Sequence, residues 1–225
     1  MNSGQSLQII AKIENDFPSK FGIPRQSGLA PLLTAKIVFE NKFRSPEALS
    51  GLENFSHIWL LWGFSEAKQE SWSPTVRPPR LGGNKKVGVF ATRSPFRPNS
   101  IGLSAVRIEK IENCEIFISG ADLMDGTPIY DIKPYLPAVD AITSATDIFN
   151  TLAEKEPLKV VVQADFIDII SEGKLAQLKE ILALDPRPAY QNDPSRIYGF
   201  PFAGCEIKFK VENNILTIVS IEKLN

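Results

Sequence analysis

The sequence is poor in the residues that build most metal and nucleophile sites. Its 225 residues include only two cysteines, Cys114 and Cys205, and one histidine, His57. Two cysteines are too few for a disulfide framework, and these two do not stand at a metal-ligand spacing. A single histidine excludes a histidine metal cluster, and its place inside a hydrophobic segment disfavours a Ser–His nucleophile. We therefore expect no bound metal and a reduced, cytoplasmic setting.

Long hydrophobic runs and targeting signals are missing as well. No apolar stretch reaches the length of a membrane span, and the first residues lack the basic and apolar regions of a signal peptide. No glycine-rich loop stands between a strand and a helix, so neither a dinucleotide fold nor a P-loop is expected. The composition, 43% hydrophobic and 23% charged, is that of a globular chain with a sizeable core.

Short segments rich in Ile, Val and Phe recur through the first two thirds of the chain, separated by Gly, Pro, Asn or Asp. Because no long amphipathic helix lies between them, they predict a mainly β fold, a single-sheeted antiparallel β-barrel. A helical turn is expected to begin at Ser45, which precedes Pro46. The expected strands are 7–13, 34–39, 57–64, 86–92, 101–111, 115–119 and 129–132.

The segment 57–64, HIWLLWGF, is apolar on both of its faces. One face of an antiparallel barrel strand normally meets water, so a second layer or a partner subunit must cover the other face. A homodimer is the favoured explanation. For His57 itself, the expected role is that of a hydrogen-bonded barrel histidine.

The pattern changes near residue 146, which predicts a barrel domain over 1–145 and a small α+β domain over 146–225. We expect a strand over 160–166, and a helix that carries Leu175, Leu178, Ile181 and Leu182. Asp185-Pro186 ends that helix, and the segment 185–202 is expected to be an extended loop. The last two strands, 206–211 and 215–221, form a hairpin around Asn213-Asn214.

The segment 77–107 is strongly basic, with five arginines, two lysines and no acidic residue. Removing these seven residues from the total of 25 basic residues leaves 18 basic against 26 acidic side chains elsewhere. Phe90 and Phe96 are interleaved with the charges. A solvated loop is the alternative, but this partition of charge favours a site for an anionic partner.

An acidic block, DLMDGTPIYDIKPYLP, spans residues 122–137. Asp122, Asp125 and Asp131 gather there around an expected turn at Asp125-Gly126. Such carboxylates can accept hydrogen bonds from ribose hydroxyls or from an ammonium group. Asp125 could equally form an ordinary Asx-turn, and the block alone does not decide between the two.

Five motifs together carry a resemblance to a known family: PRQSGL (24–29), PTVRPPRLGG (74–83), GVFATRSPFRPNSIG (88–102), the acidic block, and DPRPAY (185–190). In this order they resemble the TsaA-like family, over nearly the whole chain. The resemblance implies a β-barrel that binds S-adenosylmethionine at a homodimer interface, and a smaller C-terminal domain. It also implies methylation of N6 of threonylcarbamoyl-adenosine next to the anticodon of tRNA.

Matching the motifs residue by residue implies a cofactor site. Ser65 and Glu66 depart from the family pattern, which has an acidic residue or His followed by Gln, and the chain departs again after Tyr198. The implied cofactor-binding residues are Pro24, Arg25, Gln26, Ser65, Glu66, Arg93, Leu103, Asp122, Leu123, Met124 and Asp125.

The implied reaction assigns further roles. The acceptor nitrogen is a poor nucleophile while protonated, so a base would help, and Asp122, Asp125 and Asp131 remain open as candidates. Arg80 or Arg97 could hold the carboxylate of the threonyl group in two hydrogen bonds. Phosphate contacts are expected from Arg77, Lys85 and Lys86. The late loop with Arg187, Tyr190, Arg196 and Tyr198 is suited to stacking on unpaired bases, and packing of that loop on the barrel is the alternative.

Two other functions stay open from the sequence. A methyltransferase of the same fold could act on another small substrate. The chain's lack of overall positive charge is a point in favour of that alternative, whereas the basic segment and the DPRPAY motif count against it. A non-enzymatic RNA-binding barrel would use the basic segment but would leave the acidic block unexplained.

Overall fold

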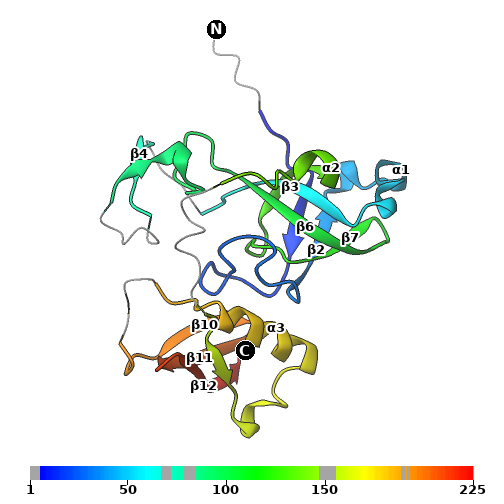
Figure 1. Ribbon diagram of the computed structural model, residues 1–225. Helices are drawn as coiled ribbons and strands as arrows, with labels where there is room; N and C mark the ends of the chain where they lie inside the picture. Colours follow the sequence, from blue (N-terminus) through cyan, green and yellow to red (C-terminus); the bar gives the residue numbers. More distant parts are fainter. Residues whose placement is uncertain are drawn as a thin grey trace.

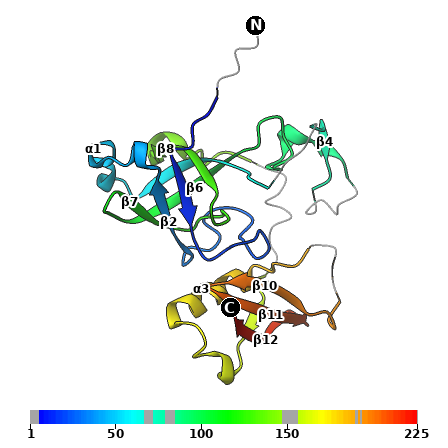
Figure 2. The same cartoon turned by 180° about the vertical axis from the view of Figure 1, so that it is seen from behind.

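The computed structural model describes residues 6–66, 72–78, 85–146, 156–188, 191 and 193–224. Two sheets, one above the other in Figures 1 and 2, organise the chain, and each sheet packs on its own hydrophobic core. No helix within the described ranges is long and apolar enough to cross a membrane.

The first sheet is a closed barrel of six strands, ordered β1-β2-β7-β6-β3-β8, and every neighbouring pair is antiparallel. The predicted antiparallel β-barrel is thereby confirmed. Alternate side chains of β3 point inward, so Ile58, Leu60 and Trp62 are buried in the barrel core. The strands are β1 Ala11–Glu14, β2 Thr34–Phe39, β3 His57–Gly63, β6 Ile101–Glu112, β7 Glu115–Ser119 and β8 Pro128–Pro134.

Part of the outer face of β3 is covered by the chain itself. Trp59 Nε1 donates to Asp140 Oδ2 at 2.9 Å, and the Trp59 and Tyr135 ring centroids lie 5.3 Å apart. Asp140 belongs to the short helix α2, Pro137–Asp140. His57 is hydrogen-bonded as expected, with Nδ1 2.9 Å from Ser56 Oγ. A second layer thus explains the apolar outer face around Trp59, and the homodimer stays a prediction.

Short helical turns flank the barrel: η1 Asn41–Phe43, α1 Pro46–Leu49 and η2 Leu52–Asn54. The turn predicted at Ser45 is α1, but the Ser45 hydroxyl donates to Glu47 Oε2 at 2.5 Å instead of capping the backbone. The strand predicted over 86–92 was wrong, because only Val87–Gly88, β5, forms a strand there. The chain then tightens into η4, Val89–Ala91, where Thr92 Oγ1 donates to Val89 O at 2.8 Å.

The second sheet has the order β10-β11-β12-β9, with β9 parallel to β12. Helix α3, Glu172–Ala183, buries Leu175, Leu178, Ile181 and Leu182, as its spacing predicted. Asn213 and Asn214 take positive φ angles of 49° and 63° in the predicted hairpin turn. The strands are β9 Lys159–Val161, β10 Tyr198–Phe202, β11 Cys205–Glu212 and β12 Ile215–Lys223.

Two predictions for this region were wrong. The strand expected over 160–166 ends at Val161 and gives way to the turn η6, Ala164–Phe166. The end of the expected loop 185–202 is instead strand β10, which pairs with β11. Pro201 is tolerated there because β10 is the edge strand of its sheet.

The segment between β1 and β2 belongs to both halves of the molecule. Phe17, Ala30 and Leu33 are buried in the core of the second sheet, and the ring centroids of Phe17 and Phe202 lie 5.2 Å apart. An ion pair joins Asp16 to Lys174 of α3, and Gln177 Nε2 donates to Thr34 Oγ1 at 3.1 Å. The division at residues 145 and 146 remains a prediction, but the second core draws on residues from both sides of it.

Candidate functional site

A loop between β1 and β2 is seated on the end of β7. Gly28 N donates to Gly120 O at 2.8 Å, and Gly120 N donates to Leu33 O at 2.9 Å. Both glycines have positive φ, 79° and 76°, which side chains disfavour. The motif that contains Pro24, Arg25 and Gln26 is thereby held beside the start of the acidic block.

Asp122 lies at the centre of this arrangement. The Ser104 hydroxyl donates to Asp122 Oδ1 at 2.6 Å and accepts a hydrogen bond from Trp62 Nε1 at 2.9 Å. Ser104 is only 1% exposed. Gly102 makes room for the Trp62 side chain in this series of hydrogen bonds, because a Cβ at position 102 would lie 2.2 Å from the Trp62 ring. One oxygen of Asp122 is therefore fixed from inside the barrel.

The surroundings of Asp122 also set its protonation. Burial raises the pKa of Asp122 above its usual value, while the Ser104 hydroxyl and the backbone N–H groups of Asp122 and Ser27 oppose the rise. The positive charge of Arg93 acts in the same direction as these hydrogen bonds. Arg93 Nη1 donates to Gln26 Oε1. Gln26, Ser27, Arg93 and Asp122, from three sequence motifs, thus form one cluster.

The late motif DPRPAY reaches the same loop. Arg25 Nη2 donates to Asp185 O at 3.4 Å and to Arg187 O at 3.1 Å. Arg187 itself pairs with Asp185, Nε to Oδ1 at 2.8 Å, and its side chain is 11% exposed. The position of Arg25 therefore depends on the C-terminal part of the chain.

The other implied cofactor residues hold varied positions. Leu103 is 55% exposed on the outer face of β6, whereas Leu123 is 1% exposed in the barrel core. Asp125 accepts a hydrogen bond from Asn15 N at 3.0 Å and sits in an exposed turn. Met124 is partly buried in that turn, and Ser65 and Glu66 are exposed after β3.

Asp131 and the predicted substrate residues lie farther along these elements. Asp131 pairs with Lys133 at 2.8 Å. Arg97 Nη1 donates to Thr92 O at 2.9 Å, and Arg196 lies over the Tyr198 ring at 5.4 Å. Arg77, Lys85 and Lys86 are exposed, while Arg80 and Tyr190 fall outside the described residues.

Sequence reasoning missed Ser104, Ser27 and the indole N–H of Trp62. The signal for Ser104 was present: it occupies an inward position of β6, between Gly102 and Val106, where apolar residues are expected. A hydroxyl at such a position needs a buried partner. The contribution of Ser27 comes from its backbone, which a residue pattern does not reveal.

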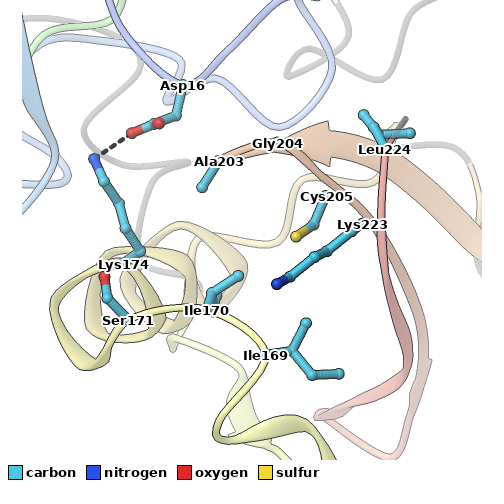
Figure 3. A pocket seen from close by; sticks show the side chains of 10 residues that line it. All are labelled: Asp16, Ile169, Ile170, Ser171, Lys174, Ala203, Gly204, Cys205, Lys223 and Leu224. Carbon is cyan, nitrogen blue, oxygen red and sulfur yellow. Dashed lines mark hydrogen bonds and ion pairs between the residues drawn. The ribbon is translucent and has the colours of Figure 1, made fainter.

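A separate cavity of about 370 Å³ opens between α3 and the second sheet (Figure 3). It is lined by Asp16, Lys174, Cys205 and Lys223, among others, and the Lys223 side chain extends across it. None of its lining residues belongs to the cluster around Asp122. No three His, Cys, Asp or Glu side chains gather as metal ligands anywhere in the described part of the chain.

The donor set of the Asp122 cluster suits a small polar cation with hydroxyl groups. A partly buried carboxylate can accept from ribose hydroxyls or an ammonium group, and Gln26 adds an amide. Arg93 can bind a carboxylate. Leu103 is not part of this cluster, but it follows Gly102 on the exposed face of β6 and offers apolar surface there. These are the groups of S-adenosylmethionine, so the residues present fit that cofactor.

Fold and site together define a β-barrel protein of the methyltransferase type, with a second α+β unit. Residues 12–141 match the tRNA-methyltransferase O N-terminal domain, and residues 157–224 match the TrmO C-terminal domain. The chain belongs to the TrmO family.

Similar proteins match nearly end to end. An Escherichia coli protein named tRNA (adenine(37)-N6)-methyltransferase is 35% identical over 234 residues, which cover 99% of both chains. A Pseudomonas aeruginosa protein, provisionally described as an S-adenosylmethionine-dependent methyltransferase, is 42% identical over 204 residues, 86% of this chain and 87% of its own. A crystal structure of TrmO from P. aeruginosa superimposes with a TM-score of 0.81 at 31% identity, covering 99% of both chains.

Proposed function

We propose that this chain is an S-adenosylmethionine-dependent tRNA methyltransferase that methylates N6 of the adenine next to the anticodon, in its threonylcarbamoyl form. The observation that carries the proposal is the cluster around Asp122, which gathers residues of three family motifs into one site in a chain that matches its relatives over nearly their full length. We further propose that it acts in the cytoplasm as a homodimer.

Gln26 and Arg93 would hold the cofactor, Leu103 would pack against it, and the Ser27 backbone N–H would keep Asp122 beside it. When bound, S-adenosylmethionine supplies an electrophilic methyl group. The acceptor nitrogen would displace the sulfur from that methyl carbon, and holding the two reactants in line supplies much of the rate enhancement in a reaction of this kind. The two hydrogen bonds from Arg25 to the late loop stabilise the loop that carries Gln26 and Ser27.

Three carboxylates, those of Asp122, Asp125 and Asp131, were candidates for the base, and we assign this role to Asp122. A new bond from N6 to the methyl carbon requires loss of the N6 proton, which a carboxylate can accept. Asp122 has a raised pKa because it is partly buried, and this makes it a stronger proton acceptor than an ordinary carboxylate. Asp131 is paired with Lys133, and Asp125 accepts a hydrogen bond from Asn15 N in its turn.

The threonyl group of the substrate carries a carboxylate, for which an arginine is the suited partner. Arg97 is partly buried, and its Nη1 is fixed on the Thr92 carbonyl. Its remaining N–H groups can grip a carboxylate in two parallel hydrogen bonds. Arg77, Lys85 and Lys86 would contact phosphates of the tRNA.

The direct test is methyl transfer from labelled S-adenosylmethionine to two tRNA pools, one with and one without threonylcarbamoyl-adenosine. We expect label in the modified pool only. Label in both pools would refute the modified base as the substrate while keeping the tRNA enzyme. Label in neither pool, with cofactor binding retained, would favour a methyltransferase that acts on another small substrate.

A further inference from the structure

A two-stranded arm stands out from the barrel and carries two stacked aromatic rings. The arm pairs β4, Thr75–Val76, with β5, Val87–Gly88, and it projects to one side of the molecule in Figures 1 and 2. The ring centroids of Trp72 and Phe90 lie 6.2 Å apart with an angle of 29° between the planes. Trp72 is 50% exposed and Phe90 is 72% exposed. Two large rings are thus open to solvent on one support.

The arm holds these rings in place. The register pairs Thr75 with Gly88, so the residues before β4 lie beside those after β5. Val89 N donates to Pro74 O at 3.0 Å, and the Val89 side chain is 1% exposed. The ring pair is therefore preorganised, and a partner that used it would lose little ordering entropy.

The described residues of the arm that flank the rings in sequence carry charge of one sign. Residues 72–78 and 85–100 contain no acidic residue, and Arg77, Lys85 and Lys86 are exposed there. Within the described ranges these three cations form no ion pair. An exposed aromatic pair beside unpaired cations matches a single-stranded nucleic acid, whose bases stack while its phosphates meet the cations.

We propose that Trp72 and Phe90 form a stacking platform for an unpaired base of the tRNA anticodon loop. The identity of the RNA rests on the proposed function, whereas the platform rests on the rings and their charges. Unpaired loop bases are the part of an RNA that aromatic side chains recognise, because a duplex keeps its bases stacked inside. A second copy of the same arm is a poor occupant, since it would bring like charges together.

The test compares the affinity of the protein for two RNA hairpins that share one stem. The first is an anticodon stem-loop with an open loop of about seven unpaired nucleotides, and the second is the same duplex closed by a loop of about four. We expect Trp72→Ala and Phe90→Ala each to weaken binding of the open loop roughly 5- to 150-fold, the range given by the loss of one stacked base. Binding of the tetraloop duplex should change little. Trp72→Phe keeps a ring at this position and should retain most of the affinity.

Three outcomes would overturn the platform. The first is equal affinity of wild type and Trp72→Ala for the open loop, and the second is an equal loss of affinity for both hairpins. The third is a variant that light scattering shows to be a smaller species than wild type while its RNA affinity is unchanged, which would make the rings a contact between subunits. The binding assay also separates this inference from the proposed function. Loss of loop affinity in a protein that methylates neither tRNA pool would keep the platform and reject the reaction.

Discussion

Removal of the Ser104 hydroxyl tests whether Asp122 is the titrating group. Ser104→Ala deletes the donor to Asp122 Oδ1 and leaves the Trp62 indole N–H without its acceptor. A hydrogen bond to a charged group contributes about 1.5–3 kcal/mol, and an unsatisfied buried donor costs about 1–3 kcal/mol. The two terms together predict that the free energy of unfolding falls by roughly 2.5–6 kcal/mol, measured by urea denaturation.

The same substitution should move the pH profile in a defined direction. The Ser104 hydroxyl stabilises the ionised carboxylate, so its loss raises the pKa of Asp122 further above the usual value. Methyl transfer that requires ionised Asp122 becomes faster as the pH rises through that pKa. The acidic limb of the kcat/KM profile should therefore move to higher pH in Ser104→Ala.

Ser119 provides a matched control in the same barrel. Ser119 is 4% exposed, and its hydroxyl donates to Glu109 Oε1 at 2.5 Å on the neighbouring strand β6. Ser119→Ala should lower stability but leave the pH profile in place. A profile that stays unmoved in Ser104→Ala as well, or that shifts equally in both variants, would refute the assignment of Asp122 as the base.

Four further outcomes are expected. Burial raises the pKa of Asp122, so wild-type stability increases as pH falls through that pKa. Asp122→Asn should therefore gain stability relative to wild type at neutral pH, lose that gain in acid, and abolish methyl transfer. Gly102→Ala forces a Cβ against the Trp62 ring and should cost about 1–3 kcal/mol in thermal unfolding, whereas Gly88→Ala, with open space and a φ of −58°, should stay within about 0.5 kcal/mol. A double-mutant cycle of Asp16→Asn and Lys174→Met should give a coupling of about 0.2–1 kcal/mol, which high salt reduces. Arg97→Lys should raise KM for modified tRNA more than it weakens cofactor binding; equal loss of binding for modified and unmodified tRNA would contradict its role with the threonyl carboxylate.

Much of the barrel could be read from the sequence because its strands alternate inward and outward residues. Strands β2 and β7 occupy 34–39 and 115–119 as predicted. The errors fall where an apolar run does not alternate in the structure, as at 86–92 and 160–166, each of which curls into a 3-10 turn. Strand β10 was missed because Gly199 and Pro201 are typical of loops, although an edge strand tolerates both.

The site was predictable in its motifs but not in its contacts. Matching the motifs located Gln26, Arg93 and Asp122, which the structure brings together. Neighbours in the same motif diverge, because successive residues point to opposite sides: Asp122 faces the cluster, whereas Leu123 enters the core. The donors that fix Asp122 come from a distant strand and from a backbone N–H, so no local pattern could specify them.

The burial of Phe17, Ala30 and Leu33 against the second sheet has a consequence for biosynthesis. These residues leave the ribosome early, but their partners extend to Ile221, nearly the last strand residue. At ~5–20 residues per second, the nascent chain waits roughly 10–40 s for them. The loop that carries Pro24, Arg25 and Gln26 lies inside this waiting segment. A nascent chain that stops before β12 therefore lacks the support of that loop, which needs the second sheet to reach its folded form.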